Sequence, residues 1–458
     1  MVIEKLEQGH FAMSTIAARQ QGLGHATSQP DPVELEFQQL KVAIHEVLVE
    51  SLNLSSSGIT NDSRFGDELR VLGKELCDLK GSHLNEETRE RLLVDLMDEV
   101  FGLGPLERLV RDPEITDILV NSPFEVHIER HGRLELTDVI FADDDHILRT
   151  VQRIAAKVGR RVDETSPMVD ARLEDGSRIN AVIPPLAIDG PLLSIRRFSA
   201  EPLRLDAMIE NGSLSSDMAD FLIGAVDAGM SFLISGGTGA GKTTLLNALS
   251  EFISEGERVV TIEDSAELQL QNSHVVRMET RSDNTEGVGA VDQRGLVRNA
   301  LRMRPDRILV GEVRGAEALD MLQAMNSGHE GSLSTIHAND TREALARLEM
   351  MAAMAGFNLP VPVVRQYIAA GIRLIVHVAR LKSGRRKVVR ISEIVGVDDG
   401  EFVVEDVFRF DRDDFSAVGV AEGVFKSTGY LPRCRSRMKA AGVDVSDCWF
   451  SSSTQATE

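Results

Sequence analysis

The chain has 458 residues, of which 42% are apolar, so it is long enough for two or three domains with a buried core. It carries 50 basic and 72 acidic residues, a formal net charge of −22, and aromatic residues make up only 4%. Because an acidic chain repels nucleic-acid phosphates and few aromatic side chains are present to stack on bases, we expect no specific nucleic-acid partner.

The N-terminal quarter of the chain is predicted to be helical after a polar tail. Residues 1–31 mix glycine and proline with polar residues and are predicted to be disordered. A Ser/Gly/Asn-rich stretch, Ser55–Asp62, is typical of a linker. This region (32–100) is interpreted either as a small packed bundle or as an arm that docks on a partner. Apolar residues at helical spacing predict three helices, at Val33–Leu52, Arg64–Leu79 and Glu86–Phe101.

Residues 101–200 are predicted to form a compact α/β module. Short strand-like runs alternate with turn residues, and one helix is expected over His146–Val158. The expected strands are Ile118–Val120, Val126–Glu129, Leu134–Thr137, Ile179–Ile183 and Leu193–Arg197.

Residues 201–458 are predicted to form the largest domain, which starts with a connector, Glu201–Leu205, and a helix over Ser215–Asp227. Up to about Asp399, short apolar strands alternate with helices, a pattern typical of a parallel sheet that is covered on both faces. The last stretch, about 400–458, is predicted to be a strand pair with a short helical appendage.

One Gly-rich segment matches the pattern G-x-x-x-x-G-K-[ST] at every fixed position, between an apolar strand and the helical run TLLNALSEFI. Glycines let successive backbone N–H groups face one anion, and a helix N-terminus favours the same negative charge. Lys242 is expected to reach the β- and γ-phosphates, and Thr243 to bind Mg²⁺. This loop is predicted to bind a nucleoside triphosphate, foremost ATP, through Gly236, Gly237, Thr238, Gly239, Ala240, Gly241, Lys242, Thr243 and Thr244.

A carboxylate also follows the apolar strand Ile308–Val310. Gly311 comes first and Glu312 next, and a charge placed directly after a buried strand is costly without a task. We expect Glu312 to polarise the attacking water and to contribute to the Mg²⁺ site. The alternative is that Glu312 is an ordinary strand-end residue in a salt bridge with Arg314.

A second group of acids ends the strand Val259–Ile262. Glu263 and Asp264 follow directly, and Glu267 lies three residues further on. Because ligands of open α/β sheets bind beyond the carboxyl ends of the strands, we expect Glu263 and Asp264 to position Mg²⁺ or water. The alternative role of these two acids is to cap a helix.

Two histidines, His329 and His337, flank the strand-like run SLSTI. A metal pair is disfavoured, because no cysteine or second carboxylate is suitably spaced. His337, at a strand end, is instead expected to donate a hydrogen bond to a γ-phosphate or to sense its loss. The alternative is that both histidines belong to the core or to turns.

The three cysteines, Cys77, Cys434 and Cys448, are too few and too far apart for a disulfide framework, which favours a reducing compartment. The sequence contains no apolar run of about 18 residues, the length of a membrane span, and no secretory signal at its start. We therefore expect a cytoplasmic protein, for which any membrane contact has to come through a partner.

Four segments together resemble the secretion-ATPase superfamily, the traffic ATPases of type II and type IV secretion and of type IV pili. They are the Gly-rich loop, IEDSAEL (262–268), RILVGEVRG (307–315) and GHEGSLSTIHAND (328–340). In this family the second is the Asp box, the last is the His box, and Gly-Glu replaces Asp-Glu in the third. Outside these segments, residues 101–123, 163–198 and 425–445 look like the Tad/Flp pilus assembly ATPases, the CpaF group.

This resemblance covers roughly residues 85–450 and implies a RecA-like P-loop domain preceded by a PAS-like domain that closes over the nucleotide. It implies ATP and Mg²⁺ as cofactors. It also implies a homo-hexamer docked on an inner-membrane platform protein, with pilin as the indirect cargo that ATP hydrolysis drives into a fibre.

The resemblance further implies an arginine finger, a cation that stabilises transition-state charge on the phosphates. Arg196 and Arg197, just before the connector, are expected to contact the nucleotide, with Arg197 as the preferred finger. Weaker candidates are Arg172 and Arg178 and, acting on a neighbouring subunit, Arg277, Arg281 and Arg298.

Other functions stay open at this point. One is another motor of the same superfamily, for type IV secretion, type II secretion or pilus retraction. A RecA-like nucleic-acid translocase is disfavoured by the negative charge, and a non-hydrolysing nucleotide-gated scaffold is disfavoured by the intact Glu312.

Overall fold

The computed structural model describes residues 31–53, 63–81, 84–197, 203–281, 288–356, 359–381, 383–412, 423–451 and 454–456. The chain divides into two units, Met1–Arg197 (unit 1) and Phe198–Glu458 (unit 2). Residues 1–30 of the predicted tail, the whole predicted linker and the first two residues of the predicted connector lie outside the described residues. Within the described part of the chain, no helix is long and apolar enough to cross a membrane.

Unit 1 begins with the three predicted helices, which the structure confirms within a few residues: α1 (Pro32–Asn53), α2 (Ser63–Lys80) and α3 (Glu86–Phe101). Asn85 caps α3, because its side-chain oxygen accepts a hydrogen bond from the Thr88 N–H at 2.8 Å. The three helices share a small apolar core of Phe37, Ile44, Leu48, Cys77, Leu92 and Leu96.

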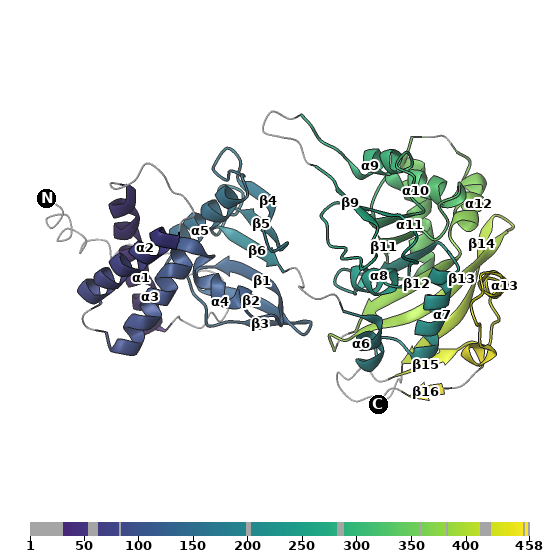
Figure 1. Cartoon of the computed structure of the whole chain (residues 1–458), viewed down its shortest axis with the longest axis horizontal. Helices are drawn as coiled ribbons and strands as arrows, with labels where there is room; N and C mark the ends of the chain where they lie inside the picture. Colours follow the sequence, from purple (N-terminus) through teal and green to yellow (C-terminus); the bar gives the residue numbers. More distant parts are fainter. Residues whose placement is uncertain are drawn as a thin grey trace. The chain divides into compact units, whose positions relative to one another are not determined.

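The rest of unit 1 is a six-stranded antiparallel sheet in the order β3-β2-β1-β6-β5-β4 (Figure 1). The helix α5 (Asp144–Lys157) packs its buried residues, such as Ile147, Val151 and Ile154, into the same core as the sheet. The strands are β1 (Ile115–Ser122), β2 (Glu125–Arg130), β3 (Arg133–Leu136), β4 (Met168–Arg172), β5 (Arg178–Val182) and β6 (Leu192–Arg196), and the short helices η2 (Gly104–Leu106) and α4 (Glu107–Val110) precede them.

A buried ionic cluster joins the helices of unit 1 to its sheet module. Glu99 on α3 is surrounded by Lys41 at 3.2 Å, His146 at 3.1 Å and Arg153 at 3.3 Å. Since the His146 Nδ1 accepts from the Ala142 N–H, its Nε2 carries the proton and donates to Glu99. Burial opposes ionisation of Glu99, but the His146 bond and the surrounding cations outweigh it and hold the pKa of this carboxyl well below its ordinary range.

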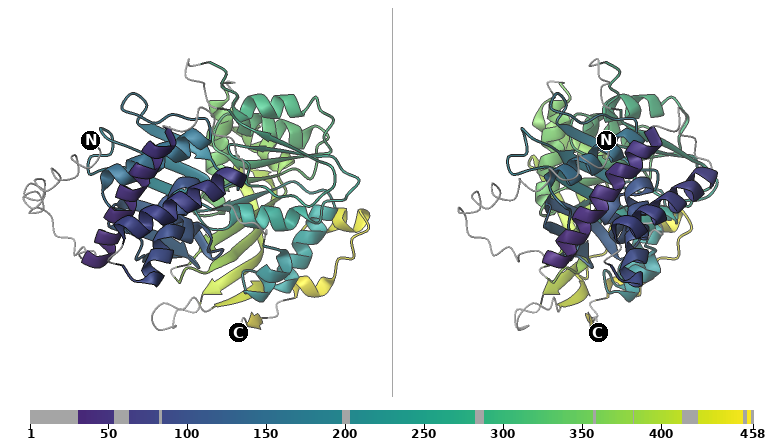
Figure 2. Two further views of the ribbon diagram at one scale, coloured as in Figure 1. Left: turned by 60° about the vertical axis from the view of Figure 1, so that its left-hand side comes forward. Right: turned by 90° about the vertical axis from the view of Figure 1, so that its left-hand side faces the viewer.

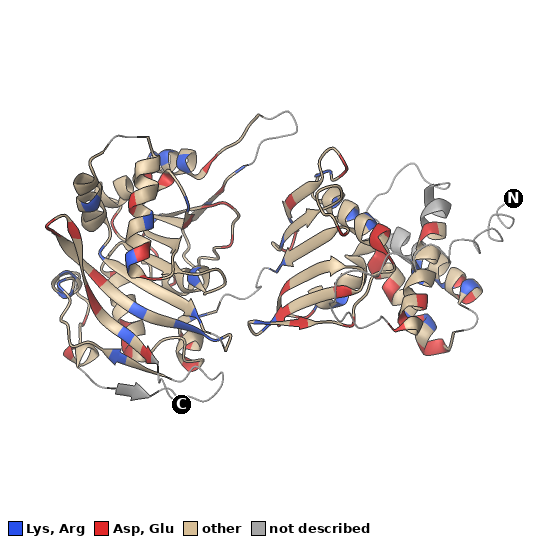
Figure 3. Ribbon diagram, turned by 180° about the vertical axis from the view of Figure 1, so that it is seen from behind, with Lys and Arg blue, Asp and Glu red and all other residues tan. Residues whose placement is uncertain are grey.

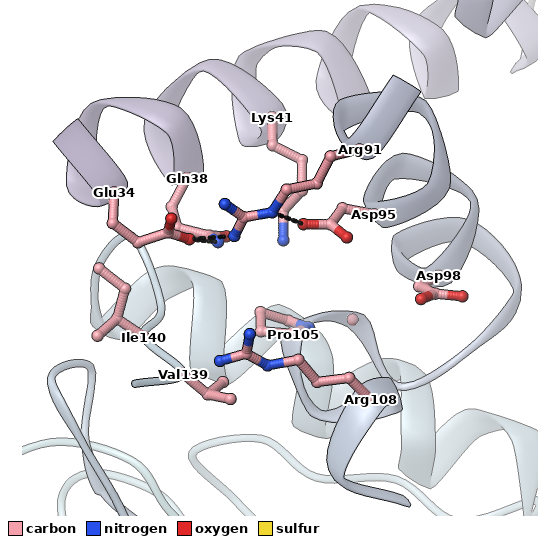
Figure 4. A pocket seen from close by; sticks show the side chains of 11 residues that line it. Glu34, Gln38, Lys41, Arg91, Asp95, Asp98, Pro105, Arg108, Val139 and Ile140 are labelled. Carbon is pink, nitrogen blue, oxygen red and sulfur yellow. Dashed lines mark hydrogen bonds and ion pairs between the residues drawn. The ribbon is translucent and has the colours of Figure 1, made fainter. Parts of the chain in front are cut away.

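A hollow of about 100 Å³ lies beside this cluster (Figure 4). On one wall, Arg91 from α3 contacts Glu34 of α1 at 2.8 Å and Asp95 at 3.7 Å. On the other wall lies Arg108, which is bound to Asp138 at 2.6 Å. The charges around the hollow are therefore paired within unit 1, which makes the contact between helices and module polar at its rim.

We predict that Glu99→Gln destabilises unit 1 by about 3–5 kcal/mol, because it leaves the Lys41 ammonium buried beside an uncharged group. Urea unfolding followed by far-UV circular dichroism measures this, and the fluorescence of Trp449, which lies in unit 2, should change little. The control is Glu86→Gln on the exposed start of α3, expected within about 0.5 kcal/mol of wild type.

The pH dependence gives a second readout of Glu99. A carboxyl whose folded pKa is lowered stabilises the fold above its unfolded pKa, and this contribution is lost as the pH falls below that value. The difference in stability between wild type and Glu99→Gln should therefore shrink as the pH falls below about 4.5. A difference that stays constant down to acid pH would contradict a role of the charge.

Unit 2 is built on a ten-stranded sheet in the order β16-β15-β14-β13-β12-β7-β11-β10-β8-β9. The six strands from β12 to β9 run parallel. They are β7 (Phe232–Gly236), β8 (Val259–Glu263), β9 (Val275–Glu279), β10 (Arg307–Val313), β11 (Leu333–His337) and β12 (Leu374–Arg380). This confirms the predicted α/β class with a parallel sheet.

Helices cover both faces of the parallel strands, as Figures 1 and 2 show. Successive residues of β7 alternate between two cores, with Phe232 and Ile234 in one and Leu233 in the other. The first core is closed by α6 (Leu205–Glu210), α7 (Ser216–Asp227) and α8 (Lys242–Ser250), the second by α9 (Gln293–Ala300), α10 (Glu317–Asn326), α11 (Thr341–Met354) and α12 (Val361–Gly371).

The predicted strand pair with a short helical appendage at 400–458 is present, but it is part of a larger antiparallel extension of the sheet. The antiparallel part begins earlier, with β13 (Arg386–Asp398), and β14 (Glu401–Arg412) pairs with it along its length. With β15 (Gly423–Ser427) and β16 (Thr454–Ala456), these strands extend the parallel sheet at one edge. The short helices α13 (Arg435–Ala440) and η3 (Asp447–Phe450) pack back onto the first core through Met438 and Phe450.

A buried carboxylate fixes this C-terminal segment. Glu393 on β13 is 2% exposed, and it accepts hydrogen bonds from the Tyr430 hydroxyl at 2.8 Å and from the backbone N–H groups of Arg433 at 2.8 Å and Cys434 at 2.6 Å. Burial and this carboxylate raise the pKa of both Tyr430 and Cys434. The segment that follows β15 is thus bonded to the middle of the sheet.

Candidate functional site

The register of the parallel strands brings the predicted site segments to one edge of the sheet. Gly236 at the end of β7 is aligned with His337 at the end of β11, and β10 is aligned with β8, from Arg307 and Val259 onward. The parallel strands of one sheet present their carboxyl ends at the same edge, which is where ligands of such sheets bind. Figure 1 shows β11 and α8, next to this edge, in the middle of unit 2.

The phosphate loop leaves β7 at Gly236 and enters α8 at Lys242. Gly239 and Gly241 have positive φ angles of 67° and 97°, which L side chains rarely adopt. A Cβ atom on Gly236 would lie 2.4 Å from the Val378 carbonyl oxygen on β12, so no side chain fits there. The loop therefore needs glycine for its backbone angles at two positions and for space at a third.

Within this loop, Lys242 lies at the N-terminus of α8, and its Nζ contacts the carbonyl oxygens of Gly236 at 3.2 Å and Gly237 at 3.1 Å. Thr243 and Thr244 follow in the first turn of α8 and are partly exposed. The first turn of this helix offers N–H groups without intrahelical partners, the property that makes a helix start an anion site. The predicted loop residues are therefore contiguous around one helix start.

Glu263 lies at the end of β8 and is 3% exposed. Its Oε2 accepts hydrogen bonds from the N–H groups of Glu267 at 2.7 Å and Leu268 at 2.9 Å, while its buried Oε1 has no hydrogen-bond partner within the described part of the chain. Burial raises the pKa of Glu263, and the two N–H groups oppose this shift. Among the described residues, no donor therefore reaches this second oxygen of Glu263.

The Glu263 side chain fits beside β10 because Gly311 has no side chain. A Cβ atom at Gly311 would lie 2.9 Å from the Cγ atom of Glu263, closer than real Cβ contacts. The unusual glycine before Glu312 is thus required by the packing of β10 against the Glu263 side chain.

Glu312 is partly exposed and accepts a hydrogen bond from Arg314 at 2.7 Å. Arg314 also contacts Asp264, at 3.3 Å, so it bridges the two acids that were predicted to be near Mg²⁺. The salt bridge of Glu312 with Arg314, which the sequence left open as the alternative, is therefore present. Both carboxylates still lie at the carboxyl ends of β8 and β10, where the sequence placed them.

His337 is the last residue of β11, and its Nδ1 lies 3.5 Å from the Thr238 hydroxyl of the phosphate loop. Its carbonyl oxygen accepts a hydrogen bond from Arg347 on α11. His329 precedes β11 at the opposite end of the strand, so the two histidines do not share a site. The structure brings only His337 to the loop.

The arginines predicted as candidate fingers differ in what they contact. Arg197 is bound within unit 1 to the carbonyl oxygens of Asp112 and Ile115, whereas Arg196 on β6 is exposed. Among the others, Arg172 and Arg178 lie on β4 and β5, Arg277 lies on β9, Arg281 donates to the Gly289 carbonyl, and Arg298 is paired with Asp320.

Some residues near the loop were missed by the sequence analysis. His377 on β12 is buried and hydrogen-bonded through its Nδ1 to Ser235, the residue before the loop, at 2.9 Å. Arg386 on β13 donates to the Gly239 carbonyl oxygen at 2.9 Å, and Arg380 lies beside it. The only sequence signal was the basic run SGRRK in a hairpin turn, which carries no motif of its own.

The described part of the chain contains no group of three or more His, Cys, Asp or Glu residues close enough to hold a metal ion. The oxygens predicted for Mg²⁺, from Thr243, Asp264 and Glu312, belong to α8 and to the two acid-bearing strand ends. Hydroxyl and carboxylate oxygens are the kind of ligand that Mg²⁺ takes beside nucleotide phosphates, so the residues suit this ion chemically.

A Gly-rich loop between a buried strand and a helix, on a parallel sheet with strand-end carboxylates, defines a P-loop protein of the α/β class. The family model "Type II/IV secretion system protein" matches residues 99–408. The chain therefore belongs to the type II/IV secretion system protein family.

Relatives carry names of secretion and conjugation proteins. A putative conjugal transfer protein of Mycobacterium tuberculosis is 40% identical over 332 residues, which cover 70% of this chain and 94% of the relative. The type IV secretion system protein VirB11 of Brucella suis is 33% identical over 305 residues, which cover 61% of this chain and 84% of that protein. The solved VirB11 ATPase of Brucella suis, in complex with sulphate, covers 65% of this chain and 97% of its own, with 29% identity and a TM-score of 0.35.

We predict that Gly311→Ala lowers the stability of unit 2 by about 1–3 kcal/mol, because its methyl group collides with the buried Glu263 stem. Urea unfolding followed by Trp449 fluorescence measures the change. Gly256→Ala is the matched control, since a Cβ atom there meets only the Ser254 hydroxyl at 3.9 Å. Equal stability of the two variants would show that the Glu263 side chain moves aside at little cost, which would contradict the prediction.

Proposed function

We propose that the protein is an ATP-hydrolysing motor of a type II or type IV secretion machine. The observation that carries this proposal is the convergence of the phosphate loop, Glu312, Glu263 and His337 at one edge of the parallel sheet. Family membership and the secretion and conjugation relatives support it.

In the proposed site, the loop residues Gly236–Thr243 and Thr244 bind the phosphates of ATP, with Lys242 as the point charge on the β- and γ-phosphates. Oxygens of Thr243, Asp264 and Glu312 would hold Mg²⁺, which would supply positive charge to neutralise the phosphates. Glu312 orients and polarises the attacking water, and for this its side chain has to leave Arg314. Glu263 helps to position that water, since its buried Oε1 can accept a hydrogen bond.

His337 is proposed to report the state of the γ-phosphate. It lies 3.5 Å from Thr238 in the loop and ends the strand that continues into α11. A change at the loop is therefore passed directly to a strand and helix of the core. This is a short route by which hydrolysis can move unit 2.

The assembly and cargo are proposed from the resemblance. We propose a homo-hexamer at the cytoplasmic face of the inner membrane, docked on a platform protein, as the resemblance implies, and relatives named for conjugal transfer and type IV secretion support this. Among the cargoes, pilin of a Tad/Flp pilus is supported by segments 101–123, 163–198 and 425–445, which look like that group of ATPases. Transport of another secreted protein is the alternative that the named relatives favour.

Lys242→Ala is expected to reduce ATP hydrolysis to background, because it removes the cation that contacts the phosphates. Phosphate release from Mg-ATP measures this, with Lys439→Ala on the exposed face of α13 as the control. In the parent cell the same variant should abolish export of the pilin or other cargo. Normal turnover of Lys242→Ala would refute the site, and export without turnover would refute the motor role.

Glu312→Gln is expected to retain ATP binding but to lose about 10²–10⁴-fold in kcat, the usual contribution of a positioned base. Arg314→Ala, which removes the observed partner of Glu312, should keep most of the activity. If Arg314→Ala lowers kcat as much as Glu312→Gln does, the role of Glu312 is to form the salt bridge and not to polarise the attacking water.

The role of Arg196 or Arg197 as an arginine finger stays a prediction, because both arginines belong to unit 1 and the proposed nucleotide site belongs to unit 2. A finger contributes about 10³-fold or more to kcat with little effect on ATP affinity. Because Arg197 is bound to backbone carbonyls of its own unit, we expect Arg196→Ala to show the kcat effect and Arg197→Ala to destabilise unit 1 instead. A large fall in kcat for a stably folded Arg197→Ala would restore Arg197 as the finger.

A further inference from the structure

The β12–β13 hairpin extends past the end of β7 and runs beside the phosphate loop. In the parallel register of β12 with β7, Val378 is aligned with Gly236, the first loop residue. Arg380, two residues further on, is therefore beyond the end of β7. Arg386 is its partner across the hairpin, so both arginines are on the same face.

These two arginines lie against the glycines of the loop. The Arg386 Nε donates to the Gly239 carbonyl oxygen at 2.9 Å, and its Cδ lies 3.4 Å from the position of a Cβ on Gly241. An Arg380 Nη1 atom lies 3.4 Å from the corresponding position on Gly239. The outer side of the loop is thus covered by the hairpin.

The hairpin is held firmly on its other face. Lys387, the residue after Arg386, points to the opposite side of the sheet, as successive strand residues do, and is buried. It donates to the Gly212 carbonyl oxygen, and its ammonium lies 5.4 Å from the ring centres of Phe410 and Phe425. Arg386 is therefore fixed by a strand that cannot easily shift.

The bond from Arg386 sets the direction of one peptide group. The carbonyl of Gly239 and the N–H of Ala240 belong to the same planar trans peptide and point in opposite directions. With the carbonyl bound to Arg386, the Ala240 N–H points into the loop, where it meets the Gly237 carbonyl oxygen at 3.3 Å. This interior also holds the Lys242 ammonium, so it is where the phosphates are proposed to bind.

We propose that Arg386 is a positioning residue that orients the Gly239–Ala240 peptide so that its N–H faces the bound phosphate, with Arg380 closing the same side of the loop. This inference rests on the proposed nucleotide site and adds a residue to it that lies 147 positions after Gly239 in the sequence. Orientation of a loop N–H acts on phosphates that ATP and ADP share. Arg386 therefore sets the affinity for both nucleotides and has less effect on kcat.

The test is a titration of the full-length chain with fluorescent ATP and ADP analogues in the presence of Mg²⁺, together with KM and kcat for ATP hydrolysis. The variants are Arg386→Ala, Arg386→Gln and Arg385→Ala. Gln carries a nitrogen donor at the same position along the side chain as the Arg Nε but no charge, so it separates peptide orientation from charge. Arg385, the exposed neighbour, is the matched control for loss of one positive charge.

Arg386→Ala is expected to weaken ATP and ADP binding by a similar factor, about tenfold, with a larger change in KM than in kcat. Arg386→Gln should bind closer to wild type than Arg386→Ala, and Arg385→Ala should bind like wild type. The proposal is overturned if Arg386→Ala binds like Arg385→Ala, if Arg386→Gln is as weak as Arg386→Ala, or if only ATP binding is lost. A wild-type chain that binds neither nucleotide would instead refute the nucleotide site itself.

Discussion

The parallel alignment of β7 with β11 is the constraint on which the rest of unit 2 depends. A strand whose two faces are covered by helices forms its backbone hydrogen bonds with the strands on either side of it. These bonds fix which residues of the neighbouring strands lie side by side. Because Gly236 is aligned with His337, β7 and β11 end side by side, and the phosphate loop leaves the sheet at this point. The glycines then follow from the space that remains, because β12 closes one side of the loop at Val378.

The same constraint explains the unusual order of small and charged residues at the strand ends. β10 lies next to β8, and the side chain of Glu263 occupies the space that a side chain at position 311 would need. The carboxylate is kept in this buried place by two backbone N–H groups. Gly311 and Glu263 on neighbouring strands thus depend on each other for packing, although about 50 residues separate them in the sequence.

The sequence predicted those parts that depend on local pattern. The three N-terminal helices, the α/β class and the phosphate loop follow from apolar spacing and from one contiguous motif, and the structure agrees with them. The contact of Arg386 with Gly239 and the space between Gly311 and Glu263 were not predictable, because they depend on which strands become neighbours. The antiparallel extension was underestimated since β13 and β14 carry charged residues on the strands themselves, which weakens the apolar pattern.

The carboxylate of Glu393 bears on the order in which unit 2 is completed during synthesis. β13 leaves the ribosome before residues 430–434, which supply the hydroxyl and the two N–H groups that this buried charge needs. Until then the carboxylate on β13 lacks those donors, and the cost of burying it unpaired opposes the final packing of this part of the sheet. The phosphate loop is synthesised almost 200 residues earlier, so the residues proposed to bind nucleotide emerge well before residues 430–434 complete the domain that supports them.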